Sequence, residues 1–301
     1  MDPDPAGRID ALRRALARIG LPAWFVVIDI LWLARPELIG IDALLYQRAA
    51  STWLAGGDPW KVTEGGVNFA AGPHTLLIYA PTSILPLNVS VAFWVVLGLG
   101  ASVWLVRHFR VPIWWLLFPP LVHSIWNGNP QTLALALLVF GGTAAAALSV
   151  VIKLYAAVPL LWRPRSLIVA GVVLVATLPL LPWQLYLAEG LGVSSHIQTA
   201  WNGSAWRFPI LLLPPTLLGL WILRRNGAEW LAVPAVWPAT QFYYVAMAFP
   251  VAIKRPILAA ALALPVPLLT PIAVIVMAAL QVWQGRRPVT PLAPSIDPGP
   301  P

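Results

Sequence analysis

The sequence predicts an all-α fold, a polytopic transmembrane bundle of about ten helical spans. The chain has 301 residues, of which 59% are hydrophobic and only 10% are charged, whereas soluble domains carry about 25% charged residues. It also contains 17 tryptophans and 32 prolines. Tryptophan favours the membrane–water interface, and spanning helices tolerate proline where neighbouring helices bond the freed carbonyls. Because cysteine is absent, disulfides, thiolate metal sites and cysteine nucleophiles are excluded.

Residues 1–20 are expected to form a basic amphipathic helix on the cytoplasmic leaflet. Apolar residues at helical spacing share one face and arginines occupy the rest: Ile9, Leu12, Leu16 and Ile19 against Arg8, Arg13, Arg14 and Arg18. A cleaved signal peptide is the alternative. No convincing small-x-small site follows the apolar run, so we expect an uncleaved first span.

The transmembrane domain is expected over residues 21–287, as apolar runs of about 20 residues. The predicted spans are 21–34, a short proline-interrupted 74–87, 89–106, 111–126, 131–162, 166–187, 208–223, 230–250 and 257–283. The run 131–162 is too long for one upright helix, and Gly141-Gly142 is the expected break. Outer loops are expected at 35–72 and 188–207. The proline-rich residues 288–301 are expected to be a disordered tail.

Basic residues predict the orientation in a bacterial plasma membrane, because arginines and lysines concentrate in short cytoplasmic loops. The pairs predicted to face the cytoplasm are Arg163 with Arg165, Arg224 with Arg225, and Arg286 with Arg287. Lys254 and Arg255 are predicted to face outward, against the usual bias. Both termini are then cytoplasmic. The net charge of +8 is attributed to these loops rather than to a nucleic-acid partner.

The first outer loop carries the clearest functional signal. It contains Asp42-x-x-x-Tyr46 and Gly56-Gly57-Asp58-Pro59-Trp60, an acidic and aromatic loop in an otherwise lipid-soluble chain. Residues 43–53 have apolar and polar faces at helical spacing, which predicts a short interfacial helix. A carboxylate here would lie at the membrane surface opposite the basic N-terminus.

These motifs resemble integral-membrane glycosyltransferases of the GT-C type, most closely glycosyltransferase family 87, the bacterial alpha-mannosyltransferases and related arabinosyltransferases. Further stretches follow in the family's order: Tyr79-Ala80-Pro81 with Leu85-Pro86-Leu87, Gly128-Asn129-Pro130-Gln131, Ile152-Lys153-Leu154-Tyr155 with Pro159, and more loosely Gln198, Gly203 and Arg207. The chain is shorter than typical members, and Asn129 and Pro130 separate the family's glycine from its glutamine. These departures leave substrate identity and activity more open than the fold.

The resemblance implies an inverting transferase that moves a sugar, with mannose expected, from a polyprenyl-phosphate donor to a glycolipid or cell-envelope glycan. Asp42 would be the general base for the acceptor hydroxyl. Arg207, Lys153 and Arg48 would bind the donor phosphate, in that order of preference. The possible substrate contacts are Tyr46, Asp58, Tyr79, Gln131 and His196. No cofactor or metal is expected, since His74 and His123 carry no partner pattern.

Each of these residues also has an ordinary structural interpretation. Asp42 is alternatively a helix-capping residue, and Asp58 before Pro59 is typical of a turn. Lys153 alternatively pairs with a carboxylate, and Arg207 alternatively anchors a helix at the interface. Asp29, inside the first span, is expected to have a hydrogen-bonded structural role.

Two other classes of function stay open on the sequence. A transporter or lipid flippase would use broken helices and charges at mid-membrane, for which Asp29 and Lys153 are available. No internal repeat accompanies them. The other class is a non-catalytic membrane subunit that binds a partner, in which Asp42 would tolerate substitution.

Overall fold

The computed structural model describes residues 19–33, 39–193, 203–224 and 226–285. This part of the chain is mostly helical, with one antiparallel pair of two-residue strands, β1 (Thr63–Glu64) and β2 (Val67–Asn68). The all-α prediction is therefore confirmed. The predictions for residues 1–18, His196 and the tail 288–301 lie outside the described residues.

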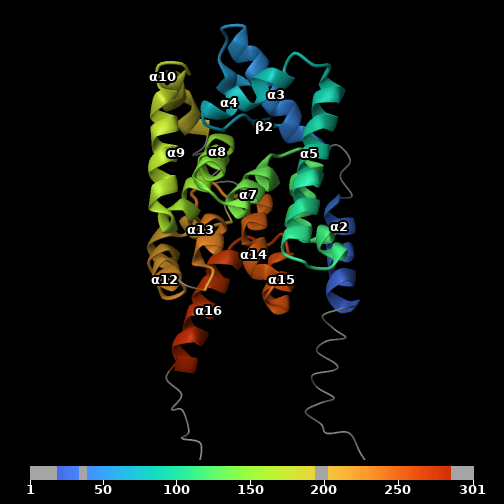
Figure 1. Cartoon of the computed structure of the whole chain (residues 1–301), viewed down its shortest axis with the longest axis vertical. Coiled ribbons are helices and arrows are strands. Elements are labelled where there is room, and N and C mark those ends of the chain that lie inside the picture. The colour runs from blue at the N-terminus through green and yellow to red at the C-terminus, as the bar shows by residue number, and fades with distance from the viewer. Residues whose placement is uncertain (1–18, 34–38, 194–202, 225, 286–301) are drawn as a thin grey trace, which may run out of the picture.

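The helices follow one another with short connections (Figure 1). The main helices are α2 (Leu21–Leu33), α3 (Ile41–Leu54), α4 (His74–Tyr79), α5 (Leu87–His108), α6 (Pro119–Trp126), α7 (Gln131–Phe140), α8 (Thr143–Ile152), α9 (Pro164–Ala176), α10 (Trp183–Leu185), α12 (Pro209–Ile222), α13 (Ala228–Val236), α14 (Phe249–Ala252), α15 (Pro256–Leu262) and α16 (Leu269–Gly285). Short helical turns join them: η3 (Pro59–Lys61), η4 (Ala80–Thr82), η5 (Ile113–Leu117), η6 (Leu154–Ala157), η7 (Pro159–Trp162), η8 (Tyr186–Gly190), η9 (Ala205–Arg207) and η10 (Phe242–Ala248).

Several apolar runs are broken where the sequence predicted single spans. The break at Gly141-Gly142 is confirmed: α7 ends just before it, and both glycines have φ near +80° (80° and 76°), which favours glycine. The single spans predicted over 111–126, 166–187, 230–250 and 257–283 are wrong, since each is divided into two or more helices. Proline contributes, because it lacks an amide donor and clashes with the preceding turn; Pro119 and Pro120, for example, begin α6 after η5.

Among the described helices, α5 is the one that is long and apolar enough to cross a bilayer by itself. Its 22 residues extend about 33 Å at 1.5 Å per residue. The other apolar helices, including α2, α7, α8, α9, α12 and α16, have 10 to 17 residues. The apolar character predicted from the sequence is present, in shorter segments.

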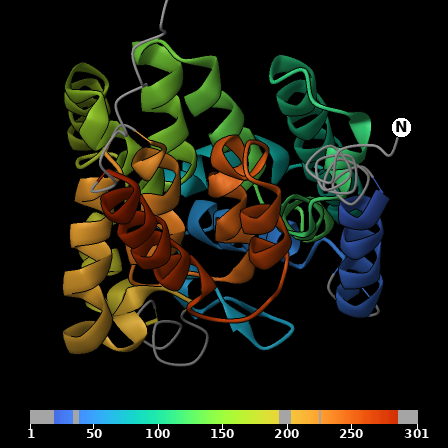
Figure 2. The ribbon, with the colours of Figure 1, turned by 90° about the horizontal axis from the view of Figure 1, so that it is seen from below.

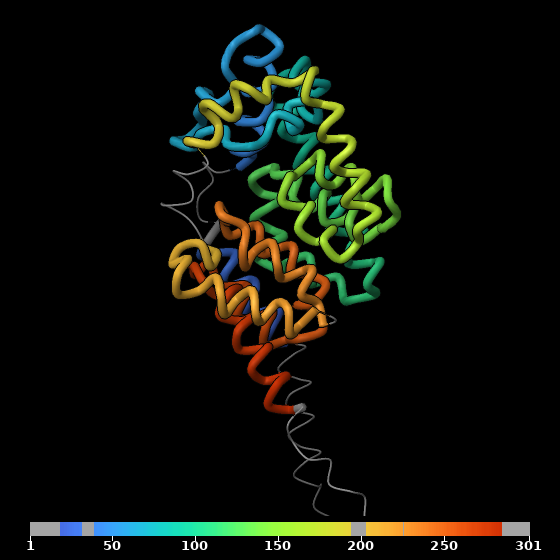
Figure 3. The backbone as a smooth tube through the Cα atoms, turned by 90° about the vertical axis from the view of Figure 1, so that its left-hand side faces the viewer, coloured from blue at the N-terminus to red at the C-terminus, as the bar shows by residue number. Residues whose placement is uncertain are grey.

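The two predicted outer loops meet at one end of the molecule. There α3, the β1–β2 hairpin and α4 lie beside the segment that follows α9 (Figures 1 and 3). The ring of Tyr186, just before the second loop, lies 5.4 Å from the ring of Trp60, and Gly190 of the second loop lies so close to the Trp60 indole that a Cβ on the glycine would meet it. The predicted helix over 43–53 is confirmed as part of α3. We call this end of the molecule the Asp42 end.

The opposite end, reached by α12 and α16 in Figure 1, carries the basic turns. Val251 packs against Gly227 so closely that a Cβ on the glycine would not fit. The turn at Lys254–Arg255 therefore lies beside Asn226 and Gly227, shortly after Arg224, and the prediction that it faces the opposite way from Arg224 is wrong. The extra chain reversal at 237–241, within the span predicted over 230–250, explains the difference. Arg163 joins this end through its ion pair with Glu229 at 3.7 Å.

Core contacts connect α2 to the C-terminal helices. Seen from below, α2 and α12 lie at opposite edges, with α16 and its neighbours between them (Figure 2). Phe25 packs against the rings of Trp114, Trp115 and Phe118, and the Trp24 indole donates to the Ala260 carbonyl at 3.0 Å. Asp29 is 8% exposed, and its Oδ2 has no hydrogen-bond partner among the described residues, so the expected bonding is not found for that oxygen.

Candidate functional site

The start of α3 is docked onto the turn between α6 and α7. The amide of Gly40 donates to the Trp126 carbonyl at 2.8 Å, and the amide of Asp42 donates to the Asn127 carbonyl at 3.0 Å. Gly40 is the residue before the helix, with φ of 68°, and no side chain caps the helix there. Asp42 is the second residue of the helix, within its first turn, so the structure does not use it as the capping residue. Its carboxylate instead points to the α6–α7 turn.

Asn129 holds the Asp42 carboxylate from this turn. The Asn129 Nδ2 donates to Asp42 Oδ2 at 2.7 Å, and Asn129 Oδ1 accepts from the Gln131 amide at 3.0 Å. Because the backbone amide of Gln131 can only donate, the second bond orients the Asn129 side chain with its NH₂ group toward Asp42. We call these two hydrogen bonds of Asn129 the Asn129 clamp. The clamp favours the ionised form of the Asp42 carboxyl and leaves Asp42 Oδ1 for another contact.

Burial dominates the electrostatics of Asp42, which is 8% exposed. Loss of solvation raises the pKa of this carboxyl above its ordinary value, while the hydrogen bond from Asn129 and the positive charge of Lys153 lower the pKa in part. A carboxylate with a raised pKa is a stronger proton acceptor than an exposed aspartate. The environment thus suits a general base.

Lys153 approaches the same region from the end of α8. It is 4% exposed, its ammonium donates a short hydrogen bond to the Tyr46 hydroxyl, and its Nζ lies 4.4 Å from the centre of the Tyr46 ring. Tyr46 follows Asp42 by one helical turn, so the two side chains share a face of α3. The sequence-based alternative was that Lys153 pairs with a carboxylate; among the described residues its ammonium bonds a tyrosine hydroxyl instead, and its charge acts on Asp42 without a direct ion pair.

Stacked rings support Tyr46 from behind. Tyr79 lies between Tyr46 and Trp94, with ring centres 4.8 Å and 4.2 Å away. Tyr79 is fully buried and, unlike Tyr46, does not line the cavities described next. Tyr79 therefore lies behind Tyr46, outside both cavities.

Two cavities meet at Asp42. The first, here the tyrosine cavity, has a volume of about 400 Å³ and is lined by residues that include Tyr46, Lys153, Tyr155, Trp237 and Tyr244. The second, here the proline-walled cavity, has a volume of about 790 Å³ and is lined by residues that include His123, Arg207, Leu262, Pro265 and Pro267. Asp42, Val67, Asn68, Gln241 and Tyr243 line both cavities.

The three predicted phosphate-binding residues occupy different places. Arg207 lines the proline-walled cavity together with Asp42, and Lys153 lines the tyrosine cavity. Arg48 lines neither of the two, and its guanidinium pairs with Glu64. The structure therefore places Arg207 and Lys153 each in a cavity that Asp42 also lines, and gives Arg48 a partner on the hairpin.

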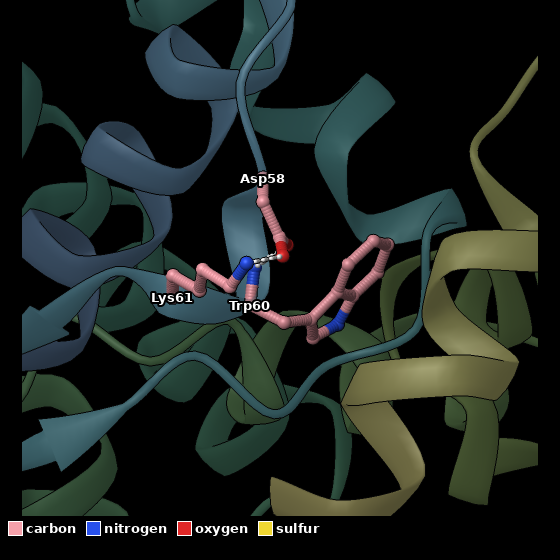
Figure 4. A network of polar contacts seen from close by, with 3 residues as sticks. All are labelled: Asp58, Trp60 and Lys61. Atoms are coloured by element: carbon pink, nitrogen blue, oxygen red, sulfur yellow. Dashed lines mark hydrogen bonds and ion pairs between the residues drawn. The ribbon is translucent and has the colours of Figure 1, made fainter.

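Asp58 makes the contacts of a turn residue. Its side chain accepts a hydrogen bond from the Trp60 amide at 2.9 Å and lies 3.5 Å from the Lys61 ammonium (Figure 4). It precedes η3 as the capping residue and lines neither cavity. Trp60 is 1% exposed, so its ring has no open face for a sugar.

Gln131 lies beside the clamp without lining a cavity. Its side chain is fully buried, and neither amide atom has a hydrogen-bond partner among the described residues. Its backbone amide makes the bond to Asn129. The glycine–glutamine element of the sequence is thus next to Asp42 in space, and Asn129 provides the direct contact.

Sequence reasoning missed several residues of the site. The sequence suggested no role for Asn129, which interrupts a motif, or for Tyr155, which is part of another. It also suggested none for Gln241, Tyr243 and Tyr244. One signal was present: the sequence has only six tyrosines against 17 tryptophans, and two of them adjoin at Tyr243-Tyr244 within an apolar run. Tyrosine adds a hydroxyl to an aromatic ring, so such a pair in a membrane-like segment indicates a polar interior.

Comparison with protein-family models, curated proteins and solved structures gives no match for this chain. Within the described ranges, no three histidine, aspartate or glutamate side chains gather in a way that could hold a metal ion. The resemblance to glycosyltransferase family 87 therefore stays a prediction, and the geometry around Asp42 carries the functional argument.

Gly128 provides a test of the docking between α3 and the α6–α7 turn. Gly128 has φ of +65°, and a Cβ there would lie 2.7 Å from the Cβ of Ala43. Gly56 has φ of +80° with open space around it. Gly128→Ala should lower the thermal midpoint in detergent more than Gly56→Ala, because steric overlap adds about 1–3 kcal/mol to the backbone strain that both share. Equal midpoints would contradict this packing.

Proposed function

We propose that this protein is a membrane glycosyltransferase that moves a sugar from a polyprenyl-phosphate donor to a hydroxyl of a glycolipid or envelope glycan. The observation that carries the proposal is the buried Asp42 carboxylate, oriented by Asn129, at the junction of two cavities of different character. Mannose is the expected sugar from the sequence resemblance. No nucleotide is needed, because the donor is already activated by its phosphate.

The proposed reaction is a single displacement at the anomeric carbon. Asp42 takes the proton of the acceptor hydroxyl while the acceptor oxygen bonds to the anomeric carbon. The bond between that carbon and the phosphate oxygen breaks, and the lipid phosphate leaves with the bonding electron pair. The anomeric configuration inverts. Positive charge near the leaving phosphate stabilises the charge that develops there.

The proline-walled cavity suits the donor. Arg207 supplies a guanidinium, which can bind a phosphate through two parallel donors. Apolar residues form another part of its wall, including Leu262, Pro265, Val266 and Leu269, and they suit the first isoprene units of a lipid. The larger volume of about 790 Å³ also agrees with a bulky donor.

The surface supports a location in the lipid bilayer. Large apolar side chains are exposed on the outer helices, among them Val96 on α5, Ile168 and Val172 on α9, and Ile210 and Leu211 on α12, each at least 64% exposed. Such patches on a monomer favour a membrane or a partner. We place the basic end in the cytoplasm, by the positive-inside bias, and the Asp42 end at the outer face. In this proposal the shorter apolar helices cross the bilayer in combination, as broken segments of the bundle of about ten spans that the sequence predicts.

A transporter is the second candidate, and one observation favours it. The start of α7 and the end of α8 meet near Asp42, and these are short helices within the predicted membrane domain, as in transporters with discontinuous helices. Uptake of labelled lipid-linked sugar into liposomes, with no covalent transfer, would be the result expected of this candidate.

Arg207 variants test the donor site. Arg207→Ala should raise the donor concentration needed for half-maximal transfer by roughly tenfold, the loss expected for one charge-assisted bond of about 1.5 kcal/mol. Arg207→Lys should fall between, because it keeps the charge and loses the paired donors. Transfer rates against polyprenyl-phosphate-sugar concentration measure this. Lys61→Ala is the control, since Lys61 is an exposed cation paired with Asp58. An unchanged donor dependence in Arg207→Ala would show that Arg207 only anchors its helix.

A further inference from the structure

The tyrosines of this chain are gathered at one site. Of the six tyrosines in the sequence, five line the tyrosine cavity, namely Tyr46, Tyr155, Tyr186, Tyr243 and Tyr244. The sixth, Tyr79, stacks on Tyr46 at 4.8 Å. The other aromatic residues are spread over the core, whereas the rings that carry a hydroxyl surround this one cavity. We propose that the tyrosine cavity binds an uncharged sugar ring of the acceptor, an assignment that rests on the proposed transferase function.

The lining has the chemistry that a sugar ring needs. A pyranose has an apolar face of C–H groups, which packs on an aromatic ring, and an edge of hydroxyls, which exchange hydrogen bonds with tyrosine hydroxyls and amides. The rings of Tyr155 and Tyr244 lie 4.4 Å apart, and Trp237 lies 5.9 Å from Tyr155. Gln241 and Asn68 add amide groups to the same wall.

One tyrosine of the lining has a buried hydroxyl that no described residue satisfies. Tyr155 is 3% exposed, and its hydroxyl is buried without a hydrogen-bond partner among the described residues. A buried hydroxyl without a partner costs about 1–3 kcal/mol, and a sugar hydroxyl in the cavity would remove that cost. Tyr79 also has a buried hydroxyl without a described partner, but it lies outside the cavity, which makes it a matched comparison.

The charges of the cavity favour a neutral ligand. The charged side chains that line it are Asp42 and Lys153, of opposite sign, and Lys153 is already bonded to the Tyr46 hydroxyl. Asp42 lines both cavities, so the cation distinguishes them: the Lys153 ammonium is engaged by Tyr46, whereas a guanidinium can bind a phosphate through two donors. The phosphate is better accommodated in the other cavity, beside Arg207.

The shared wall explains how two substrates could meet. Asp42, Asn68, Gln241 and Tyr243 line both cavities. An acceptor sugar in the tyrosine cavity would direct a hydroxyl toward Asp42 while the donor approaches the same carboxylate from the proline-walled cavity. The volume of about 400 Å³ is at the lower end of the range for ligand pockets, as suits one or two sugar units without their lipid.

Binding of small neutral sugars without any donor tests the assignment. Methyl α-mannoside and methyl α-glucoside would be titrated against the full chain in nanodiscs, with saturation-transfer NMR to detect weak binding, and inorganic phosphate as the competitor. At least one glycoside should bind, and phosphate should not displace it. Tyr155→Phe should weaken binding by about two- to tenfold, the value of one hydrogen bond, and Tyr79→Phe should leave it unchanged.

The outcomes separate this inference from the proposed function. Absence of glycoside binding, displacement by phosphate, or equal affinity in wild type and Tyr155→Phe would overturn the assignment of the cavity. Tyr155→Phe keeps the ring and removes a hydroxyl that bonds no described residue, so loss of folding does not confuse the result. A protein that binds glycoside as expected yet transfers no sugar from polyprenyl phosphate would contradict the transferase function. The assignment of the tyrosine cavity as a sugar-binding site would still be supported.

Discussion

Asp42→Asn is expected to reduce sugar transfer by about 10²–10⁴-fold, the usual contribution of a general base, while the protein accumulates in membranes at its normal level. The asparagine keeps the size of the side chain, and its carbonyl oxygen can still accept the bond that Asn129 now donates at 2.7 Å. It cannot take the acceptor proton at neutral pH. Transfer from labelled polyprenyl-phosphate sugar measures the loss.

Asp58→Asn is the matched control for this experiment. It makes the same substitution at the same end of the molecule, but Asp58 caps η3, and asparagine caps a helix as well as aspartate does. Transfer by Asp58→Asn should therefore stay near the wild-type rate. Full activity in Asp42→Asn would show that the base lies elsewhere and would remove the role proposed for the clamp.

Asn129→Ala is expected to slow transfer at neutral pH by about ten- to a hundredfold, because it removes a hydrogen bond of about 1.5–3 kcal/mol to a charged group. The bond favours the ionised carboxylate, so its loss raises the pKa of Asp42 beyond the increase that burial already causes. Transfer needs the ionised form and falls as pH decreases through this pKa. The acidic limb of the rate profile should therefore move to higher pH.

Two further variants distinguish positioning from simple damage. Asn129→Asp places a second carboxylate beside Asp42, which should move the acidic limb higher than Asn129→Ala does. Ser124→Ala removes a hydrogen bond to the backbone carbonyl of Asn129 at 3.2 Å and leaves the bond from Asn129 to Asp42. The acidic limb of its rate profile should therefore coincide with that of the wild-type protein. A fall in rate without any shift of the limb would mean that Asn129 stabilises the turn and does not tune Asp42.

The sequence predicted the parts of the fold that depend on local pattern. The apolar run of α5, the helix α3 and the break at Gly141-Gly142 follow from periodicity, length and glycine. The interruptions within 230–250 and 257–283 were missed, because hydropathy averages over the few residues where a chain reverses. The reversal missed within 230–250 also placed Lys254 and Arg255 at the wrong end, since it changes the direction of the chain up to the next missed reversal, within 257–283.

The candidate site could be predicted only where its residues are close in the chain. Asp42 and Tyr46 are one helical turn apart, and the loop that carries them was recognised. Their contacts with Asn129 and Lys153 span 87 and 107 residues, and no local rule relates such positions. The division into two cavities depends on Gln241 and Tyr243, which lie far from the other residues in sequence and reach the site through the packing of η10.

The most direct test of the account is transfer by the purified protein in liposomes, with labelled polyprenyl-phosphate mannose and an envelope lipid extract from cells that lack the protein. The account predicts a labelled glycolipid with inverted anomeric configuration from wild type, and at most about a hundredth of that product from Asp42→Asn. A product with retained configuration, or a wild-type protein that binds the donor and forms no glycolipid, would contradict single displacement with Asp42 as the base.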